Sequence, residues 1–308
     1  MLKGLVLTPP EIGRISIGKV VERNGKRLPE KDDGFTVTSQ VQGSNGWVVH
    51  PVDETLRKSP GAKLRSIPVR LLFNEPDLNM RSSYAMFDRK TGRPLCVGNG
   101  ESCKRATATG MQILPCLTPD ACEVGIEGHC KPYGRLNVRI GDDDELGSFV
   151  FRTTGFNSIR TLSTRLSYFK AVSGGHLTTL PLELRLRGKS TTQSHRAPIY
   201  YVDLTVRSGM TLLEAIASAR KESEQRKDAG FDQAALDEAG QAGFANGMFE
   251  ESEEESAAVV EEFYPELSAD VGELSSSDAK VDAPGLADKL RQKAGKVEQQ
   301  NAVGTTSE

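Results

Sequence analysis

The chain has 308 residues, with 39 lysines and arginines against 42 aspartates and glutamates, so its formal net charge is −3. Its apolar residues never form an uninterrupted run of about 18, the length that a membrane-spanning helix needs, so we expect no membrane span. The first ten residues contain one lysine and a short apolar run that ends in two prolines, which makes a poor signal peptide. We therefore expect a cytoplasmic protein whose cysteines stay reduced.

The charge is distributed unevenly along the chain. Residues 221–308 hold 8 lysines and arginines against 21 aspartates and glutamates, a net charge of −13, and the remainder carries +10. A basic body indicates binding of nucleic acid or another polyanion by displacement of counterions, although ordinary solubility explains the same charge. The acidic tail could cover that body, imitate its polyanion or recruit a separate basic partner, and the charge pattern leaves these three open.

Alternating apolar residues in the first part of the chain predict strands that pair as hairpins. Residues 13–22 and 34–41 alternate and are joined by a polar turn at Asn24 and Gly25, which predicts a hairpin with a basic tip. A further strand is expected around 67–73. A strand and a turn are expected before the first cysteine.

The same pattern resumes after the last cysteine. Residues 134–155 predict a hairpin with an acidic turn at 141–147, and residues 158–173 have apolar side chains at helical spacing. Residues 180–209 predict a second hairpin, whose basic residues are Arg185, Arg187, Lys189, Arg196 and Arg207. We expect one globular body over 1–207, of the α+β class and mainly β, with antiparallel hairpins and one or two packed helices.

The character of the sequence changes after residue 207. Thr211 and Glu214 form a capping box at the start of a helix expected over 208–229. Residues 230–308 contain few large apolar side chains, so we expect a largely disordered acidic tail. Its stretch "AVVEEFYPEL", residues 258–267, is either a segment that docks on a partner or part of an inert solvated tail. A short helix is possible at 283–296.

All five cysteines lie within residues 96–130, separated by six, twelve, five and seven residues. An odd number fits a full disulfide framework badly, whereas clustered thiolates suit tetrahedral zinc. The segment is poor in large apolar residues and rich in glycine and proline, so a bound metal would supply its missing stability. We predict a structural zinc site with candidate ligands Cys96, Cys103, Cys116, Cys122 and Cys130.

The choice of four ligands among the five cysteines stays open at this point. Zinc sites usually contain two tight pairs of cysteines, and this sequence has none, so the spacing is not specific. We prefer the quartet Cys96, Cys103, Cys116 and Cys130, with Cys122 as its main competitor. His129 could replace a thiolate, but a surface position suits it better.

The sequence predicts no catalytic residues. The histidines at 50, 129, 176 and 195 belong to no recognisable motif, and an all-thiolate zinc site is typical of structural rather than catalytic zinc. The acidic run at 142–145 could bind a divalent cation, but its position between two strands favours a solvated turn. We therefore expect a protein that is not an enzyme.

Four stretches resemble one known family. They are "EIGRISIG", "NGKRLPEKDDGFTVTS", the cysteine cluster containing "LPC" and ending in "CKPYGRLNVRI", and "GSFVFRTTGFNS". Over residues 11–207 they resemble the recombination directionality factors of phages and integrative elements. The resemblance implies a non-enzymatic protein that binds a large serine integrase, biases it toward excision and inhibits integration. The acidic extension is not part of the shared pattern.

A direct DNA-binding accessory protein is the alternative. Exposed aromatic rings on a basic β-rich body can stack on bases, and half or more of the available rings are expected in the core. The candidates are Trp47, Tyr84, Phe87, Tyr200 and Tyr201. In either case we expect a monomeric or weakly associating protein.

Overall fold

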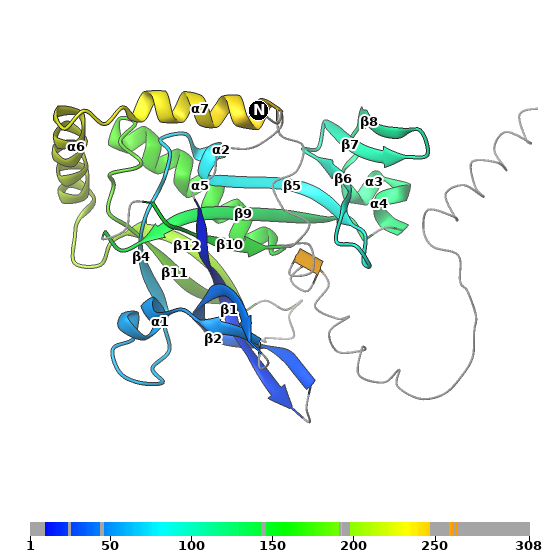
Figure 1. Cartoon of the computed structure of the whole chain (residues 1–308), viewed down its shortest axis with the longest axis horizontal. Coiled ribbons are helices and arrows are strands. Elements are labelled where there is room, and N and C mark those ends of the chain that lie inside the picture. The colour runs from blue at the N-terminus through cyan, green and yellow to red at the C-terminus, as the bar shows by residue number, and fades with distance from the viewer. Residues whose placement is uncertain are drawn as a thin grey trace, which may run out of the picture.

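The computed structural model describes residues 10–23, 26–43, 46–127, 129–142, 146–190, 192, 198–246, 259–260 and 263 (Figure 1). The strands are β1 (Glu11–Arg23), β2 (Lys26–Gly43), β3 (Gly46–Val49), β4 (Ser66–Arg70), β5 (Met80–Phe87), β6 (Pro94–Gly98), β7 (Ser102–Thr107), β8 (Gly110–Pro115), β9 (Lys131–Ile140), β10 (Ser148–Thr153), β11 (Leu182–Lys189) and β12 (Ile199–Val206). The helices are α1 (Pro51–Leu56), α2 (Pro76–Asn79), α3 (Thr118–Ala121), α4 (Glu123–Glu127), α5 (Phe156–Ser173), α6 (Leu212–Asp228) and α7 (Gln233–Asn246).

Within these ranges the strands form one connected sheet. Its main path runs β3-β2-β1-β10-β9-β5-β6-β7-β8. Neighbours on this path are antiparallel except for β1 and β10, which are parallel. The far end of β9 also pairs with β4, which leads to β11 and β12. Both hairpins predicted after the cysteine cluster are present as β9–β10 and β11–β12, and β1–β2 is the predicted N-terminal hairpin, whose tip at residues 24–25 lies outside the described residues.

One row of apolar side chains crosses the sheet and forms the centre of the core. Val37, Ile15, Phe151, Leu136 and Met80 are successive partners on β2, β1, β10, β9 and β5, and each is less than 5% exposed. The alternation that predicted the strands places these residues on one face, and burial of each contributes about 1.5–3 kcal/mol.

Helix α5 covers this apolar face. Its buried residues include Ile159, Leu162, Leu166 and Phe169, the spacing that predicted an amphipathic helix. The helix ends at Gly174, whose φ of 70° is the left-handed conformation that glycine adopts without steric cost. The fold is therefore α+β and mainly β, as predicted.

Helix α6 begins with the predicted capping box. The Thr211 side chain accepts from the Glu214 backbone N–H, and the Glu214 carboxylate accepts from the Thr211 backbone N–H. Ala215 and Ala219 are fully buried against the core. No helix among the described residues is long and apolar enough to cross a membrane.

Helix α7 contradicts the expectation that little structure follows residue 230. Leu236 packs against a cluster of Leu72, Phe73 and Leu78. Asp237 accepts a hydrogen bond of 3.1 Å from the backbone N–H of Asn74. The prediction of disorder was therefore wrong for residues 233–246. Beyond them only residues 259, 260 and 263 are described, so the possible helix at 283–296 lies outside the described residues.

The cysteine segment 96–130 has more regular structure than its composition suggested. Strands β6, β7 and β8 continue the main sheet beyond β5, and α3 and α4 follow them at one end of the molecule (Figure 1). A small cluster holds the segment together, in which Cys96 and Cys103 are themselves buried beside Met86. The thiol groups thus serve as small apolar core residues as well as candidate ligands.

Candidate functional site

Four of the five cysteines line a single small pocket. Cys96 lies on β6, Cys116 follows β8, and Cys122 and Cys130 flank α4. The volume of the pocket is about 10 Å³, which is close to that of one water-sized sphere. The pocket therefore has the size of a site for a single ion rather than for an organic ligand.

Cys103 is close to this group but does not line the pocket. It is 2% exposed on β7, and its thiol lies 3.7 Å from the carbonyl oxygen of Pro115, to which it donates. The structure therefore gathers Cys122, the competitor in the sequence analysis, with Cys96, Cys116 and Cys130. His129 is exposed, and its Nδ1 lies 3.1 Å from the carbonyl oxygen of Glu127, so it does not face the pocket.

A glycine at each of two positions allows the thiol groups to approach one another. A side chain at Gly98 would lie 2.7 Å from Cys103 Cβ and 2.8 Å from Cys116 Sγ. At Gly125 a Cβ would lie 3.2 Å from Cys122 Cβ and 3.3 Å from Cys130 Cβ. Any larger residue at Gly98 would force the β6–β7 hairpin away from the thiol of Cys116.

Arg105 brings a positive charge to the edge of the pocket. Its Nε lies 3.5 Å from Cys96 Sγ and its Nη2 lies 3.3 Å from Cys122 Sγ, so the guanidinium donates to both sulfur atoms. Hydrogen bonds from a charged donor favour sulfur in its thiolate form. The side chain is thus placed to offset excess negative charge on a set of thiolates.

Burial raises the pKa of two thiols of the cluster. Burial, together with the neighbouring sulfur atoms of Cys96, Cys116 and Cys122, raises the pKa of Cys130 to about 12 against the opposing charge of Arg105. Burial likewise raises the pKa of Cys103 to about 11, together with a hydrogen bond to Cys96. These shifts agree with the crowding of four cysteines around one small pocket.

The arrangement is not a finished coordination site. In the part of the chain that the structure describes, no group of three or more His, Cys, Asp and Glu side chains is arranged so that it could hold a metal ion as it stands. The five cysteines form no disulfide. Of the acidic run at 142–145, only Asp142 is described, and it forms ion pairs with Arg70 at 2.7 Å and Arg207 at 2.7 Å.

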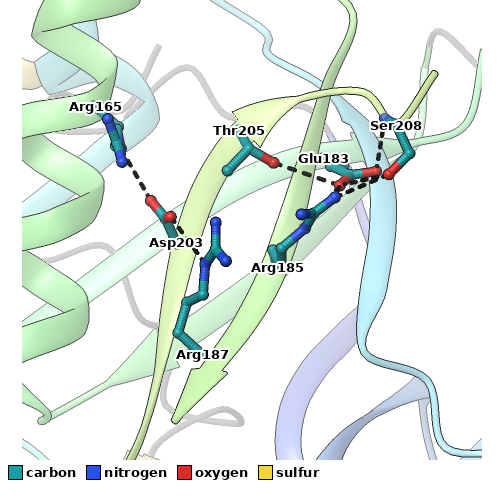
Figure 2. Close-up of polar contacts among 7 residues, drawn as sticks. All are labelled: Arg165, Glu183, Arg185, Arg187, Asp203, Thr205 and Ser208. Atoms are coloured by element: carbon teal, nitrogen blue, oxygen red, sulfur yellow. Dashed lines mark hydrogen bonds and ion pairs between the residues drawn. The ribbon is translucent and has the colours of Figure 1, made fainter. Parts of the chain in front are cut away.

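Arg185 and Arg187 of the β11–β12 hairpin are paired with carboxylates (Figure 2), whereas Lys189 donates to Asn157 Oδ1 at 2.7 Å and Arg196 lies outside the described residues. Asp203 accepts from Arg165 Nε at 3.0 Å and from Arg187 Nε at 3.2 Å. Glu183 accepts from Arg185 Nε at 3.0 Å and from the Ser208 N–H at 3.0 Å. This face is therefore a network of ion pairs rather than a strip of free positive charge.

Acid should weaken this side of the molecule. Burial raises the pKa of Glu183, but the Ser208 N–H and the Arg185 guanidinium lower it further, to a net value below 4.5. The guanidinium groups of Arg207 and Arg70 hold the pKa of Asp142 well below its usual range. Both carboxyls are more acidic in the folded state, so their stabilisation is complete above the unfolded pKa values of 4.5 and 3.8 and is lost as the pH falls through the folded ones.

We expect the free energy of unfolding, measured with urea, to fall as the pH is lowered from about 5 to about 3. The fall begins within about one pH unit above the two unfolded pKa values and continues below them. Asp142→Asn should be less stable than wild type at pH 7 and should lose less on acidification. Asp120→Asn, on the exposed surface of α3, is the control and should follow the wild-type curve. Equal acid sensitivity of wild type and Asp142→Asn would refute the role of this carboxylate.

Another set of arginines lies on the sheet face opposite the apolar row. Arg81, Arg135 and Arg152 are adjacent in register on β5, β9 and β10. Arg135 is 3% exposed and Arg152 is 7% exposed, and Glu11 contacts both. Buried guanidinium groups cannot contact DNA phosphates without a rearrangement of what covers them.

Two of the aromatic candidates for base stacking are already engaged. Phe87 is 4% exposed and packs against Tyr133, with ring centroids 5.4 Å apart. Trp47 is covered by the guanidinium of Arg14, which lies 3.9 Å from its ring centroid. Tyr84 on β5 and the adjacent Tyr200 and Tyr201 on β12 remain partly exposed. The described surface therefore presents no continuous stacking platform of the predicted kind.

The sheet, the α5 core and the cysteine segment coincide with the extent of one protein family. Residues 12–207 match the family model described as Gp3-like, recombination directionality factor-like. The chain belongs to this family, which confirms the resemblance seen in the sequence and supports a general accessory role in recombination in phages and mobile elements. No curated protein and no solved structure gave a significant match to the chain.

Proposed function

We propose that the protein is a non-enzymatic factor that binds a serine integrase and biases it toward excision. The family match supports this proposal, because it spans the body from β1 to β12 and ends before α6, α7 and the acidic tail. The cytoplasm, where phage and element DNA recombines, is the compartment in which such a factor would act with its thiols reduced.

To change the direction of recombination, the factor must bind one arrangement of the integrase more tightly than another. Equal affinity for both arrangements would shift neither population. A rigid contact surface is therefore required, since a flexible one would adapt to both arrangements.

The cysteine segment is the proposed contact surface. Four of its large apolar side chains are exposed: Met111 by 41%, Ile113 by 75%, Leu117 by 58% and Ile126 by 62%. Single exposed apolar residues are ordinary, but this number on one 35-residue segment is typical of a protein interface. Strand β8, which carries Met111 and Ile113, also ends the main path of the sheet and offers an edge for a partner.

Zinc would supply the rigidity of this segment. We propose Cys96, Cys116, Cys122 and Cys130 as its ligands, because these four line one ion-sized pocket. Four thiolates around Zn²⁺ carry a net charge of −2, and the guanidinium of Arg105 beside two of the sulfur atoms offsets part of it. The metal would be structural, because four thiolate ligands leave no open position for a substrate or water.

The test is a recombination assay with the serine integrase encoded beside this protein. We expect the protein to stimulate excision and inhibit integration, and to bind the integrase in a pull-down. Ile113→Asp should weaken integrase binding by about tenfold or more, as expected for a charge placed at the centre of an apolar interface. Leu213→Asp on α6, which is 78% exposed and outside the family match, is the control and should bind normally.

Direct DNA binding is the outcome that would replace this proposal. A gel shift on single- and double-stranded DNA across a salt series separates the two functions, because phosphate contacts weaken steeply as salt rises. Strong salt-dependent DNA binding, with no binding to the integrase and no change in the direction of recombination, would contradict the integrase-directed role.

A further inference from the structure

A short piece of the acidic tail packs onto the body of the protein. Val259 and Phe263 are both 0% exposed and belong to one apolar cluster with Ala85, Phe87 and Tyr133. Ala85 and Phe87 lie on β5 and Tyr133 lies on β9, next to the cysteine segment. Figure 1 draws the tail piece in orange, set apart from the helices that precede it.

Phe263 is the anchor of this contact. Its ring centroid lies 4.9 Å from that of Phe87, at an angle of 72°, and 6.1 Å from that of Tyr133. Lys131 Nζ donates to the carbonyl oxygen of Phe263 at 3.1 Å and lies 5.3 Å from the centre of its ring. Edge-to-face aromatic contacts and a cation over the ring each add to the energy of apolar burial.

The tail piece has the pattern of an acidic helix with an apolar stripe. Val259 and Phe263 are four residues apart, so a helical turn places them on the same face. Glutamates precede and separate them, at 253–255 and 261–262. An aromatic anchor with flanking carboxylates complements an apolar surface that has a lysine at its edge.

The family model covers one side of this contact and not the other. Ala85, Phe87, Lys131 and Tyr133 lie within the matched range 12–207, whereas the tail piece lies outside it. A body without this extension would therefore present Phe87 and Tyr133 as exposed aromatic surface, which is typical of a binding site for another protein.

We propose that Ala85, Phe87 and Tyr133 form a docking surface for an acidic helix with an aromatic anchor, and that Val259 and Phe263 of the tail piece close it in cis. A protein segment of the same chemistry binds only after the tail piece leaves. Because the tail piece belongs to the same chain, its effective concentration at the surface is about 1 mM, which weakens a competitor by about tenfold if the intrinsic dissociation constant of the tail piece is near 0.1 mM. This inference does not depend on the recombination role.

The experiment uses the full-length chain and a fluorescent peptide with the sequence of residues 253–268. Binding is measured by fluorescence anisotropy. The peptide should bind the Phe263→Ala chain about tenfold more tightly than wild type, because the cis competitor has lost its anchor. Val259→Ser is a second variant that should open the surface in the same way. A peptide carrying the Phe263→Ala change should bind neither chain.

Two further variants identify the surface. Adding Lys131→Met to the Phe263→Ala chain should weaken peptide binding several-fold, because it removes the hydrogen bond and the charge at the edge. Adding Ile126→Ala, on the neighbouring helix α4, should leave binding unchanged. Equal affinity of the peptide for wild type and the Phe263→Ala chain, or no binding to either chain, would overturn the proposal.

Discussion

Cys122→Ser should remove the bound zinc from the purified protein, whereas Cys103→Ser should leave it in place. We expect about one equivalent of zinc in wild type and less than about a tenth in Cys122→Ser, because a tetrahedral structural site requires all four of its ligands. Metal content is measured by elemental analysis of protein purified under reducing conditions without chelator.

Cys103→Ser is the matched control, because it makes the same sulfur-to-oxygen change at a cysteine that does not line the pocket. Cys103 is 2% exposed and its thiol donates to the Pro115 carbonyl, a role that a serine hydroxyl can fill at a cost of about 1 kcal/mol. The reverse result, with metal lost from Cys103→Ser and kept in Cys122→Ser, would favour the quartet preferred from the sequence. Wild-type protein without zinc would refute the metal site altogether.

Loss of the metal should also loosen the surface proposed for the integrase. Binding of structural zinc stabilises small metal-dependent segments by about 10 kcal/mol or more. We therefore expect faster hydrogen exchange over residues 96–130 in Cys122→Ser, with little change in the α5 core, because the core row and its helix contain none of the cysteines.

The spacing of apolar residues, alternating in the strands and helical in α5, was sufficient to predict the hairpins and this helix, because the core lies on one face of each of these elements. Ile15 and Phe151 show the limit of that information. They are partners in a parallel pair of strands far apart in the sequence, and the pattern within each strand carries no record of its neighbour. For the same reason, the sequence could not predict that β9 pairs with β4 as well as with β5 and β10.

The choice among the cysteines depended on strand register. Cys96 lies opposite Arg105 and Gly98 lies opposite Cys103 in the β6–β7 ladder. This register puts the guanidinium of Arg105 beside the sulfur of Cys96. It also places Cys103 opposite Gly98, where the missing side chain leaves room for Cys103 Cβ and Cys116 Sγ. The spacing of the cysteines along the chain reveals neither of these contacts. The sequence could therefore locate the cluster but could not identify which four cysteines line the pocket.

Helix α7 and the tail piece were missed because both are held by contacts supplied by distant parts of the chain. Gly240 of α7 approaches Phe73 and Leu78 so closely that a Cβ would lie 3.0 Å from each. Small residues permit that close approach. In the sequence, however, a stretch of small residues with few large apolar side chains predicts a segment that forms no core of its own. Phe263 stood out as an aromatic residue in acidic surroundings, but its site exists only where β5 and β9 pair.

Glu11→Gln should destabilise the protein by about 3 kcal/mol, far more than the loss of an exposed ion pair. The Glu11 carboxylate accepts from Arg135 Nη2 and from Asn137 Nδ2 at 3.1 Å, and it lies 3.7 Å from Arg152 Nη2. Burial raises the pKa of Glu11, but the two arginines lower it further, to a net value below 4.5. The glutamine keeps the shape of the side chain and leaves two buried guanidinium groups without this negative charge.

Glu11 is the first residue of β1, so its loss should loosen the start of this strand. Its contacts attach β1 to β9 and β10, so they set the direction in which the β1–β2 hairpin leaves the sheet. In Glu11→Gln we expect faster hydrogen exchange over residues 11–17 and a lower urea midpoint. Glu75→Gln, which removes the partner of Lys170 in a pair with side chains 36–37% exposed, is the control and should cost less than about 1 kcal/mol. If both variants lost the same stability, the buried carboxylate would not be what holds the hairpin to the sheet.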